Sequence, residues 1–327
     1  MEENYSVPQE EVKGDNSMMG GEMFHKMRLR FFSLAGKAFN DQLNGILEQY
    51  KTPDPLFGPP IFRNFEFNKE FCSQIKSWAE SGDVMVLVGD LGGRKSQFID
   101  ELVYRSLVLV SSDGSSGCSF VDKHRSRGEV FYMGLQRHLM NGVEEEIKYK
   151  NSMRLGQIRS ALPEAEPAIR DAEACIFGMS AMRKSDVPGK RHPGISGLFM
   201  EEACQLSRYF GIADQSSVLW INGFKENGKD LVDSADAVAQ LVWYFLDGVA
   251  SRKSDYPIER SQLVEYSISG VHDLDSVVFY KSKLSGRWWF SLSEEYNPLT
   301  LHACSFKDYQ MLCNGEVSDR LFRFLEE

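Results

Sequence analysis

Five short apolar segments divide the central part of the chain. Their apolar residues are continuous and do not alternate with polar ones, which is typical of parallel strands that are covered on both faces. The segments are VMVLVG (84–89), LVLVS (107–111), VFYMG (130–134), CIFGM (175–179) and VLWIN (218–222). Helical patterns lie between several of them. Strands that alternate with helices predict an α/β fold around a mainly parallel sheet.

Two of the helical segments carry one apolar stripe each. Residues 64–83 are expected to form a helix that ends at Gly82, and residues 197–212 a helix that ends at Gly211. Glycine is common just past the last turn of a helix. The stripes have the spacing of an amphipathic helix. They consist of Phe67, Phe71, Ile75 and Trp78 in the first helix and of Phe199, Ala203, Leu206 and Phe210 in the second.

A third helix is expected over residues 233–248. Ser234 is its predicted N-cap, because a serine hydroxyl can accept a bond from an unpaired backbone N–H of the first turn. Gly248 is its predicted C-cap. The stripe expected to face the core consists of Val238, Leu241, Val242 and Phe245.

The ends of the chain differ in composition from its middle. Residues 1–60 are interpreted as an N-terminal arm and a proline-rich connector, because TPDPLFGPP (52–60) cannot continue a helix. Residues 61–327 are expected to form a single α/β domain. A β-hairpin made of residues 276–282 and 286–292 is predicted as its C-terminal extension.

Composition narrows the classes of partner and compartment. The chain has 327 residues, of which 42% are hydrophobic, and a formal net charge of -10. An acidic chain is a poor match for nucleic acid, and the basic clusters KHRSR (123–127) and GKRH (189–192) are interpreted as solvated loops. No apolar run approaches the roughly 20 residues that span a bilayer. The acidic N-terminus lacks the apolar core of a secretory signal, so we expect a cytoplasmic protein without membrane contact.

Cysteine and histidine give no catalytic arrangement. The six cysteines are scattered without a C-x-x-C pair, so they are interpreted as buried thiols. Cys204 lies in an apolar helical pattern, and His192 lies in a predicted loop. Neither has the neighbouring base or orienting group that nucleophilic catalysis requires.

One loop partly matches a phosphate-binding motif. In GDLGGRKS, residues 89–96, Gly89, Lys95 and Ser96 fit the P-loop pattern, but Arg94 stands where the pattern has its second glycine. A side chain there obstructs the backbone N–H groups that wrap a phosphate. The loop is therefore expected to be an ordinary strand-to-helix turn, and a nucleotide-binding protein with a degenerate P-loop remains an alternative.

A third of the chain resembles a known family. Residues 154–189, which contain ACIFGMSAMRKSDVPG, are similar to a strand and substrate loop of the arginase/ureohydrolase family, in particular of its formimidoylglutamase-like branch. Residues 194–222 resemble the helix and strand that follow in that family. Residues 237–257 resemble its last long helix. The three pieces occur in the family's order.

The resemblance implies a fold and a chemistry. The fold would be a three-layer α/β/α sandwich with a mainly parallel sheet. The family holds two manganese ions at the carboxyl ends of the strands, where they activate a bridging hydroxide for attack on a guanidinium carbon. Two adjacent divalent ions need several carboxylates and histidines to hold them.

Most of these ligands are absent at the corresponding positions. The turn after residues 84–89 has no histidine in any register and contains Gly92. At the family's Asp-x-His-x-Asp motif, Asp113 is the one position that retains a metal-ligating residue. Ser115 replaces the histidine, and Gly117 replaces the second acid.

The other two family positions have lost their acids as well. The family's Asp-x-Asp becomes Gly178 and Ser180, and the acid that binds the guanidinium becomes Trp220. Asp90 and Asp186 do not stand at ligand positions and are interpreted as turn residues. We call the seven positions at the family's site the vestigial pocket. They are Gly92, Asp113, Ser115, Gly117, Gly178, Ser180 and Trp220.

These patterns favour a non-catalytic protein of the ureohydrolase fold, with no catalytic residue, no metal ligands and no bound manganese. Its role would be binding or assembly, with an unknown protein partner or small ligand. An active metal-dependent C–N hydrolase with unusual ligands is an alternative. A homo-oligomer is implied by the resemblance only. Trp288 and Trp289 are expected in the core of the hairpin, with an interface role as the alternative.

Overall fold

The computed structural model describes residues 27–55, 57–65, 68–90, 106–114, 129–140, 151–191, 194–256, 259–271, 274–293 and 295–325. Its largest element is an eight-stranded sheet in the order β2-β1-β3-β8-β7-β4-β5-β6, and every neighbouring pair is parallel. The strands are β1 (Leu29–Ser33), β2 (Arg63–Asn64), β3 (Val84–Val88), β4 (Ser106–Val110), β5 (Glu129–Leu135), β6 (Ser152–Arg154), β7 (Ala174–Gly178) and β8 (Val218–Asn222).

The five predicted strands are confirmed. They correspond to β3, β4, β5, β7 and β8, with ends that differ by a residue or two from the expected ones. Every residue of β3, β7 and β8 is buried. This explains their continuous apolarity, because both faces of a central parallel strand are covered.

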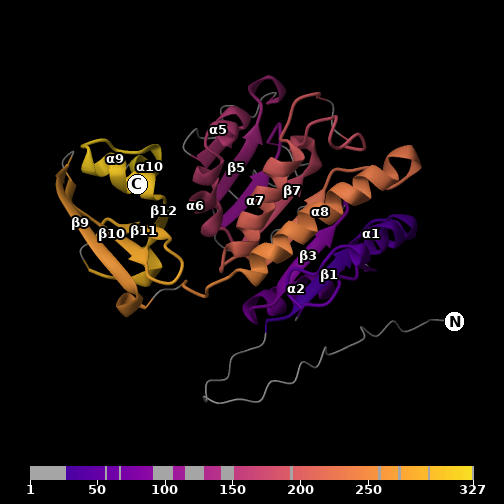
Figure 1. Ribbon diagram of the computed structural model, residues 1–327, viewed down its shortest axis with the longest axis horizontal. Coiled ribbons are helices and arrows are strands. Elements are labelled where there is room, and N and C mark those ends of the chain that lie inside the picture. The colour runs from indigo at the N-terminus through magenta and orange to yellow at the C-terminus, as the bar shows by residue number, and fades with distance from the viewer. Residues whose placement is uncertain are drawn as a thin grey trace, which may run out of the picture.

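Helices cover both faces of the sheet, so the molecule is a three-layer α/β/α sandwich (Figure 1). On one face, α2 (Lys69–Glu80) contributes Phe71 and Ile75 to an apolar cluster with the sheet. Asn68 caps α2 by accepting a bond from the backbone N–H of Phe71, and Phe67 of the predicted stripe lies outside the described residues. The other face is covered by α1 (Lys37–Gln49), α5 (Leu155–Ser160), α6 (Ala165–Arg170), α7 (Met200–Ile212) and α8 (Leu231–Ala250).

The glycines of α7 and α8 serve the packing of these helices. α8 begins at Leu231 and runs through Gly248 to Ala250, so Ser234 is not its N-cap and Gly248 not its C-cap. A Cβ atom added at Gly211 would lie 2.0 Å from the carbonyl oxygen of Phe245 and 2.9 Å from the Cα of Gly248. The two helices therefore cross where both lack side chains. The predicted stripe of α8 is buried as expected.

The sandwich begins earlier than the sequence indicated. β1 pairs with β3 inside the sheet, and α1 packs on α8, with Phe39 stacked on Phe224 at 4.7 Å between ring centroids. The boundary placed at residue 61 was therefore wrong, because residues 29–49 belong to the sandwich. Only a short connector separates α1 from β2.

The C-terminal extension is larger than a hairpin. β10 (Leu274–Ser282) and β11 (Trp288–Ser291) pair as predicted, and Gly286 has a positive φ of 75° in the turn between them. They belong to an antiparallel sheet in the order β12-β11-β10-β9. We call residues 259–325 the C-terminal unit. Its other elements are β9 (Leu263–Val271), β12 (His302–Cys304), α9 (Phe306–Cys313) and α10 (Asp319–Leu325).

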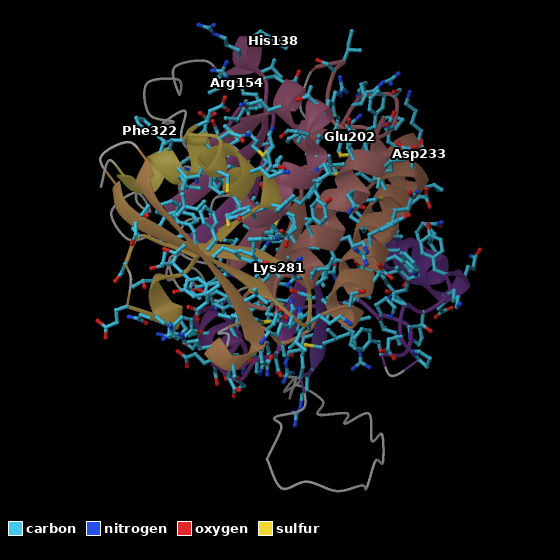
Figure 2. All side chains as sticks on the ribbon, turned by 60° about the vertical axis from the view of Figure 1, so that its left-hand side comes forward. His138, Arg154, Glu202, Asp233, Lys281 and Phe322 are labelled. Atoms are coloured by element: carbon cyan, nitrogen blue, oxygen red, sulfur yellow. The ribbon has the colours of Figure 1, made fainter. Side chains whose placement is uncertain are left out.

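The adjacent tryptophans of β11 point to opposite faces of this sheet. Trp289 is fully buried in a cluster with Tyr280, and Trp288 packs in a second cluster with Phe279. Core packing of the tryptophan pair is thus confirmed. Figure 2 shows Lys281 of β10 on this part of the molecule, and its ammonium lies 5.5 Å from the ring centroid of Trp288.

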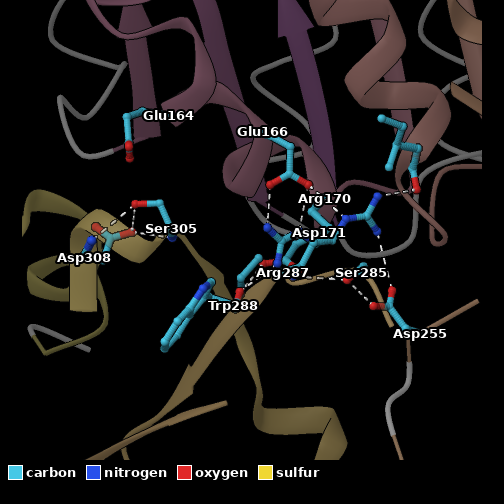
Figure 3. A network of polar contacts seen from close by, with 12 residues as sticks. Glu164, Glu166, Arg170, Asp171, Asp255, Ser285, Arg287, Trp288, Ser305 and Asp308 are labelled. Carbon is cyan, nitrogen blue, oxygen red and sulfur yellow. Dashed lines mark hydrogen bonds and ion pairs between the residues drawn. The ribbon is translucent and has the colours of Figure 1, made fainter. Parts of the chain in front are cut away.

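The C-terminal unit is attached to the sandwich beside α6, at the amino ends of the strands (Figure 1). Arg170, at the end of α6, donates to Glu166 at 2.9 Å and to the carbonyl oxygen of Trp288 at 2.7 Å. Its guanidinium also lies 4.6 Å from the ring centroid of Trp289. Asp171 accepts a bond from the backbone N–H of Ala303 at 3.1 Å. We call this contact the amino-edge network (Figure 3).

A second arginine of the amino-edge network comes from the C-terminal unit itself. Arg287 lies 3.5 Å from Glu166, 3.8 Å from Asp214 and 3.6 Å from Asp255. Burial is the main cause that raises the pKa of Asp214, and Arg287 opposes it. Burial likewise raises the pKa of Asp171 to about 6, against the opposing charge of Arg170.

Candidate functional site

The carboxyl ends of the parallel strands meet at one edge of the sheet, where α/β proteins place their ligands. Asp113 follows β4, Gly178 ends β7 and Ser180 lies in the turn that follows β7. Asn222 ends β8. The structure therefore brings Asp113, Gly178 and Ser180 to the same edge, as the resemblance implied.

Asp113 is held by a serine that the sequence did not single out. The hydroxyl of Ser111 donates to the Oδ1 of Asp113 at 2.8 Å, and it lies 3.5 Å from the hydroxyl of Ser180. Asp113 is only 7% exposed and Ser111 is fully buried. Ser111 thus links two strands of the edge through hydroxyl groups.

The backbone of neighbouring strands packs tightly around Gly178. A Cβ atom added there would lie 3.0 Å from the carbonyl oxygen of Val110 and 3.4 Å from the hydroxyl of Ser180. A contact of 3.0 Å is tighter than ordinary van der Waals distance, so an aspartate at this position would require β4 or β7 to shift. A side chain at this position would thus crowd the end of β4.

Trp220 fills the interior under this edge. It is the central residue of β8 rather than its last one, so the expected position at the carboxyl end was two residues off. Its side chain is 1% exposed and packs with Ile75 of α2. The indole N–H donates to the carbonyl oxygen of Gly89 at 2.8 Å, which ties β8 to the end of β3.

Lys190 is buried beside Ser180, which the sequence did not indicate. Only 2% of it is exposed, and its ammonium donates to the carbonyl oxygen of Met182 at 2.5 Å and approaches that of Ser180 at 3.5 Å. Burial lowers the pKa of Lys190, and the charge of Lys184 lowers it further. The interpretation of GKRH as a solvated loop was therefore wrong at this residue.

The two aspartates outside the family positions have structural partners. Asp186 lies in a turn, as interpreted, but its side chain accepts a bond from the backbone N–H of Met200, the first residue of α7, and not from the local backbone. Asp90 forms an ion pair with Arg191 at 2.7 Å. Arg191 also contacts Glu226 at 3.2 Å, so these charges compensate one another at the rim of the edge.

Close packing explains the glycine at the start of the P-loop-like segment. Gly89 has a φ of 106°, and an added Cβ atom would lie 2.9 Å from the backbone nitrogen of Ala35. A glycine is thus needed where β3 passes the end of β1, whatever the loop binds. Arg94, Lys95 and Ser96 lie outside the described residues, so the expectation of an ordinary turn stays a prediction.

Three residues of the vestigial pocket also lie outside the described residues: Gly92, Ser115 and Gly117. The residues described at this edge do not fit a pair of divalent ions. No group of three or more histidines, cysteines, aspartates or glutamates with a metal-binding arrangement occurs in the described ranges. Among the described residues, Asp113 is linked to Ser180 through the hydroxyl of Ser111, and the ammonium of Lys190 lies on the other side of Ser180, near its carbonyl oxygen.

Two buried donors at this edge have no hydrogen-bond partner among the described residues. They are the Nδ2 of Asn222 and the hydroxyl of Ser112. Buried polar atoms are nearly always paired with protein or water. These two donors are therefore available to a small ligand or water that offers acceptor oxygens.

Comparison with known proteins places the fold. No family model matches the sequence, and no curated protein matches it. A Trypanosoma cruzi formiminoglutamase structure with Mn²⁺ is similar with a TM-score of 0.57 and 12% identity, covering 71% of this chain and 96% of that one. Formimidoylglutamase from Bacillus subtilis gives 0.53 and 10%, covering 69% and 88%.

An agmatine ureohydrolase from Thermoplasma volcanium is similar to the same degree, with a TM-score of 0.53, 10% identity, and coverage of 70% of this chain and 92% of that one. These structures share an architecture with the present chain at very low identity. The chain therefore has the fold of the arginase/ureohydrolase superfamily, which confirms the fold that the resemblance implied.

Proposed function

We propose that this protein is a non-catalytic relative of the ureohydrolases, a pseudoenzyme that acts by binding or assembly. The observation that carries the proposal is the chemistry at the carboxyl edge. Gly178 and Ser180 at this edge, and Trp220 beneath it, stand where the resemblance places carboxylates. A Cβ atom at Gly178 would lie only 3.0 Å from the carbonyl oxygen of Val110. Among the described residues, Asp113 is the one family position at this edge that keeps a carboxylate, and one carboxylate is too little charge to hold two divalent ions.

The buried lysine strengthens the proposal. The ammonium of Lys190 lies 3.5 Å from the carbonyl oxygen of Ser180, and Ser180 in turn lies 3.5 Å from Ser111. In its charged form this group repels a divalent cation at the same edge, and burial reduces the screening of that repulsion. The positive charge that metal ions would supply is thus provided by a side chain.

The edge keeps the capacity to bind a small polar molecule. The unpaired donors of Asn222 and Ser112 and the ammonium of Lys190 all favour a ligand with acceptor oxygens. We also propose that the protein is cytoplasmic and assembles with copies of itself. None of the helices in the described ranges is both long enough and apolar enough to cross a bilayer.

Metal analysis combined with an activity assay tests the proposal. The purified chain is incubated with excess Mn²⁺, desalted and analysed for metal, and then assayed for urea or formamide release from arginine, agmatine and formiminoglutamate. We expect less than stoichiometric manganese and no turnover, in the parent and in Asp113→Asn alike. One or two ions per chain, lost in Asp113→Asn and accompanied by turnover in the parent, would favour the active hydrolase instead.

A further inference from the structure

We propose that β9 is the self-association surface of this protein, and that it pairs antiparallel with β9 of a second copy across a two-fold axis at Ser267. This specifies the assembly part of the proposed function. It depends on the C-terminal unit and not on the carboxyl edge. Its failure would therefore leave the proposal of a non-catalytic site untouched.

The two edges of the antiparallel sheet differ in how they are protected. β12 has three residues, and the backbone N–H of Ala303 is already bonded to Asp171 of the sandwich. β9 has nine residues, and β10 is its strand partner in the described part of the chain. Figure 1 shows β9 along the outer side of the C-terminal unit. A long edge strand with free backbone groups is a template for another strand.

Two of the usual protections of an edge strand, lysine and proline, are missing from β9. Its sequence, LVEYSISGV, contains no lysine and no proline. Its one charged residue, Glu265, is paired with Arg260 at 2.7 Å. Ser267 and Ser269 are exposed, and Val264 is 37% exposed. Glu265 is thus the one charge of this strand that a second strand must avoid facing with another acid.

The hydrogen-bond pattern shows which residues point outward. The backbone N–H of Lys283 donates to the carbonyl oxygen of Gln262, and residues 262 and 283 are partners in the register of β9 with β10. In an antiparallel pair such bonded positions alternate with positions whose N–H and C=O point away. The outward positions of β9 are therefore Leu263, Glu265, Ser267 and Ser269.

Overlap and charge together favour one register among those that a two-fold axis allows. An axis at any residue of β9 brings outward groups to outward groups, because residues paired across it differ by an even number of positions. An axis at Glu265 would place two carboxylates directly opposite each other, which is unfavourable. An axis at Tyr266, Ile268 or Ser269 would shorten the overlap, since Ser267 is the middle residue of β9. An axis at Ser267 pairs Glu265 with Ser269 and lets the strands overlap over most of their length.

The side chains are complementary in this register. Tyr266 of each copy lies opposite Ile268 of the other, an aromatic and β-branched pair of the kind that stabilises sheets. Both side chains lie on the face that packs on Phe279 and Val277, and both are only partly buried in the single chain. Dimer formation would extend the aromatic cluster of this face across the axis.

Hydrodynamic measurements on the full chain test the interface. We expect a dimer by sedimentation velocity, and a shift to monomer in Ser267→Pro, which removes an outward N–H without removing a bond to β10. Ser267→Ala keeps that N–H and should remain dimeric. Thermal unfolding shows whether Ser267→Pro is folded. A parent that is monomeric at all concentrations, or a folded Ser267→Pro that is dimeric, would overturn the proposal.

Disulfide trapping tests the register and does not depend on a proline variant. Two copies of Ser267 face each other on the axis, at the roughly 5.5 Å Cα separation of a bonded antiparallel pair, which a disulfide can span. Oxidised Ser267→Cys should therefore form a covalent dimer. Ser269→Cys should not, because Glu265 lies opposite it. The parent with its native cysteines gives the background, and equal trapping of both variants would contradict the register.

Discussion

The two ends of the parallel strands bury opposite kinds of polar group. At the amino ends, Arg170 and Arg287 meet the carboxylates of Glu166, Asp214 and Asp255 in a network that joins the C-terminal unit to the sandwich. At the carboxyl ends, the hydroxyl of Ser111 is bonded to Asp113, and the ammonium of Lys190 lies beside the carbonyl oxygen of Ser180. The amino edge uses its charges for an internal contact, whereas the described part of the carboxyl edge buries Asp113 and Lys190, each bonded to a neutral group.

The difference has an energetic basis. Buried charges are costly unless they are paired and hydrogen-bonded. At the amino edge, Arg170 satisfies this condition with Glu166 and a backbone carbonyl. At the carboxyl edge, acids without metal ions would be unpaired, and neutral residues avoid that cost. Gly178, Ser180 and Trp220 are neutral residues of this kind, which agrees with the proposed site without metal ions.

Removing the indole under the carboxyl edge should have the largest effect on stability. We expect Trp220→Ala to lower the free energy of unfolding by about 3–5 kcal/mol, because the side chain is fully buried and its N–H is bonded to Gly89. Urea unfolding measures the change. Trp243→Ala is the matched control, since Trp243 is only partly buried. A Trp220→Ala protein as stable as the parent would show that the Trp220 side chain is not packed in the interior as described.

Breaking the amino-edge network should have a smaller effect. Arg170→Met keeps much of the side-chain volume but removes the bonds to Glu166 and to the carbonyl oxygen of Trp288. We expect a loss of about 2–3 kcal/mol in the same urea experiment. Arg260→Met is the control, because the pair of Arg260 with Glu265 is exposed. Equal losses in both variants would mean that the network does not hold the C-terminal unit.

Lowering the pH should slightly stabilise the contact between the C-terminal unit and the sandwich. The pKa of Asp171 is raised to about 6 in the folded state, so the folded protein binds this proton more tightly than the unfolded chain does. The stabilisation of the folded state that this proton provides is complete below the unfolded pKa of about 3.9. It is lost as the pH rises through about 6, the pKa of Asp171 in the folded state. From pH 7 to pH 5 the parent should gain about 1 kcal/mol relative to Asp171→Asn. Parallel pH profiles of the two proteins would contradict this.

Much of the sandwich was predictable because its strands are buried on both faces. β3, β4, β5, β7 and β8 carry continuous apolar runs, which predicted each of them. β2 and β6 have two and three residues, too few for a periodic signal. β1 was missed for a different reason, since it lies before a proline-rich stretch that was interpreted as the boundary of the domain.

The misassigned residues share a physical cause, which is tertiary contact. Glycine is common at helix ends, so Gly211 and Gly248 were interpreted as such ends. In the structure they lie where α7 and α8 cross and have no space for a side chain. Lys190 lies in a charged segment, and only the fold shows that its ammonium is turned inward. Asp113 and Ser180 lie near each other through Ser111, because strand ends of a parallel sheet converge regardless of local detail.

Direct titration of the protein with Mn²⁺ tests the central claim most sharply. Free Mn²⁺ gives a strong electron paramagnetic resonance signal that bound Mn²⁺ does not, so the concentration of bound ion can be counted at each step. We predict that the free signal rises in proportion to added Mn²⁺, with the same slope in the parent and in Asp113→Asn. Saturable binding of one or two ions per chain that is lost in Asp113→Asn would contradict the account.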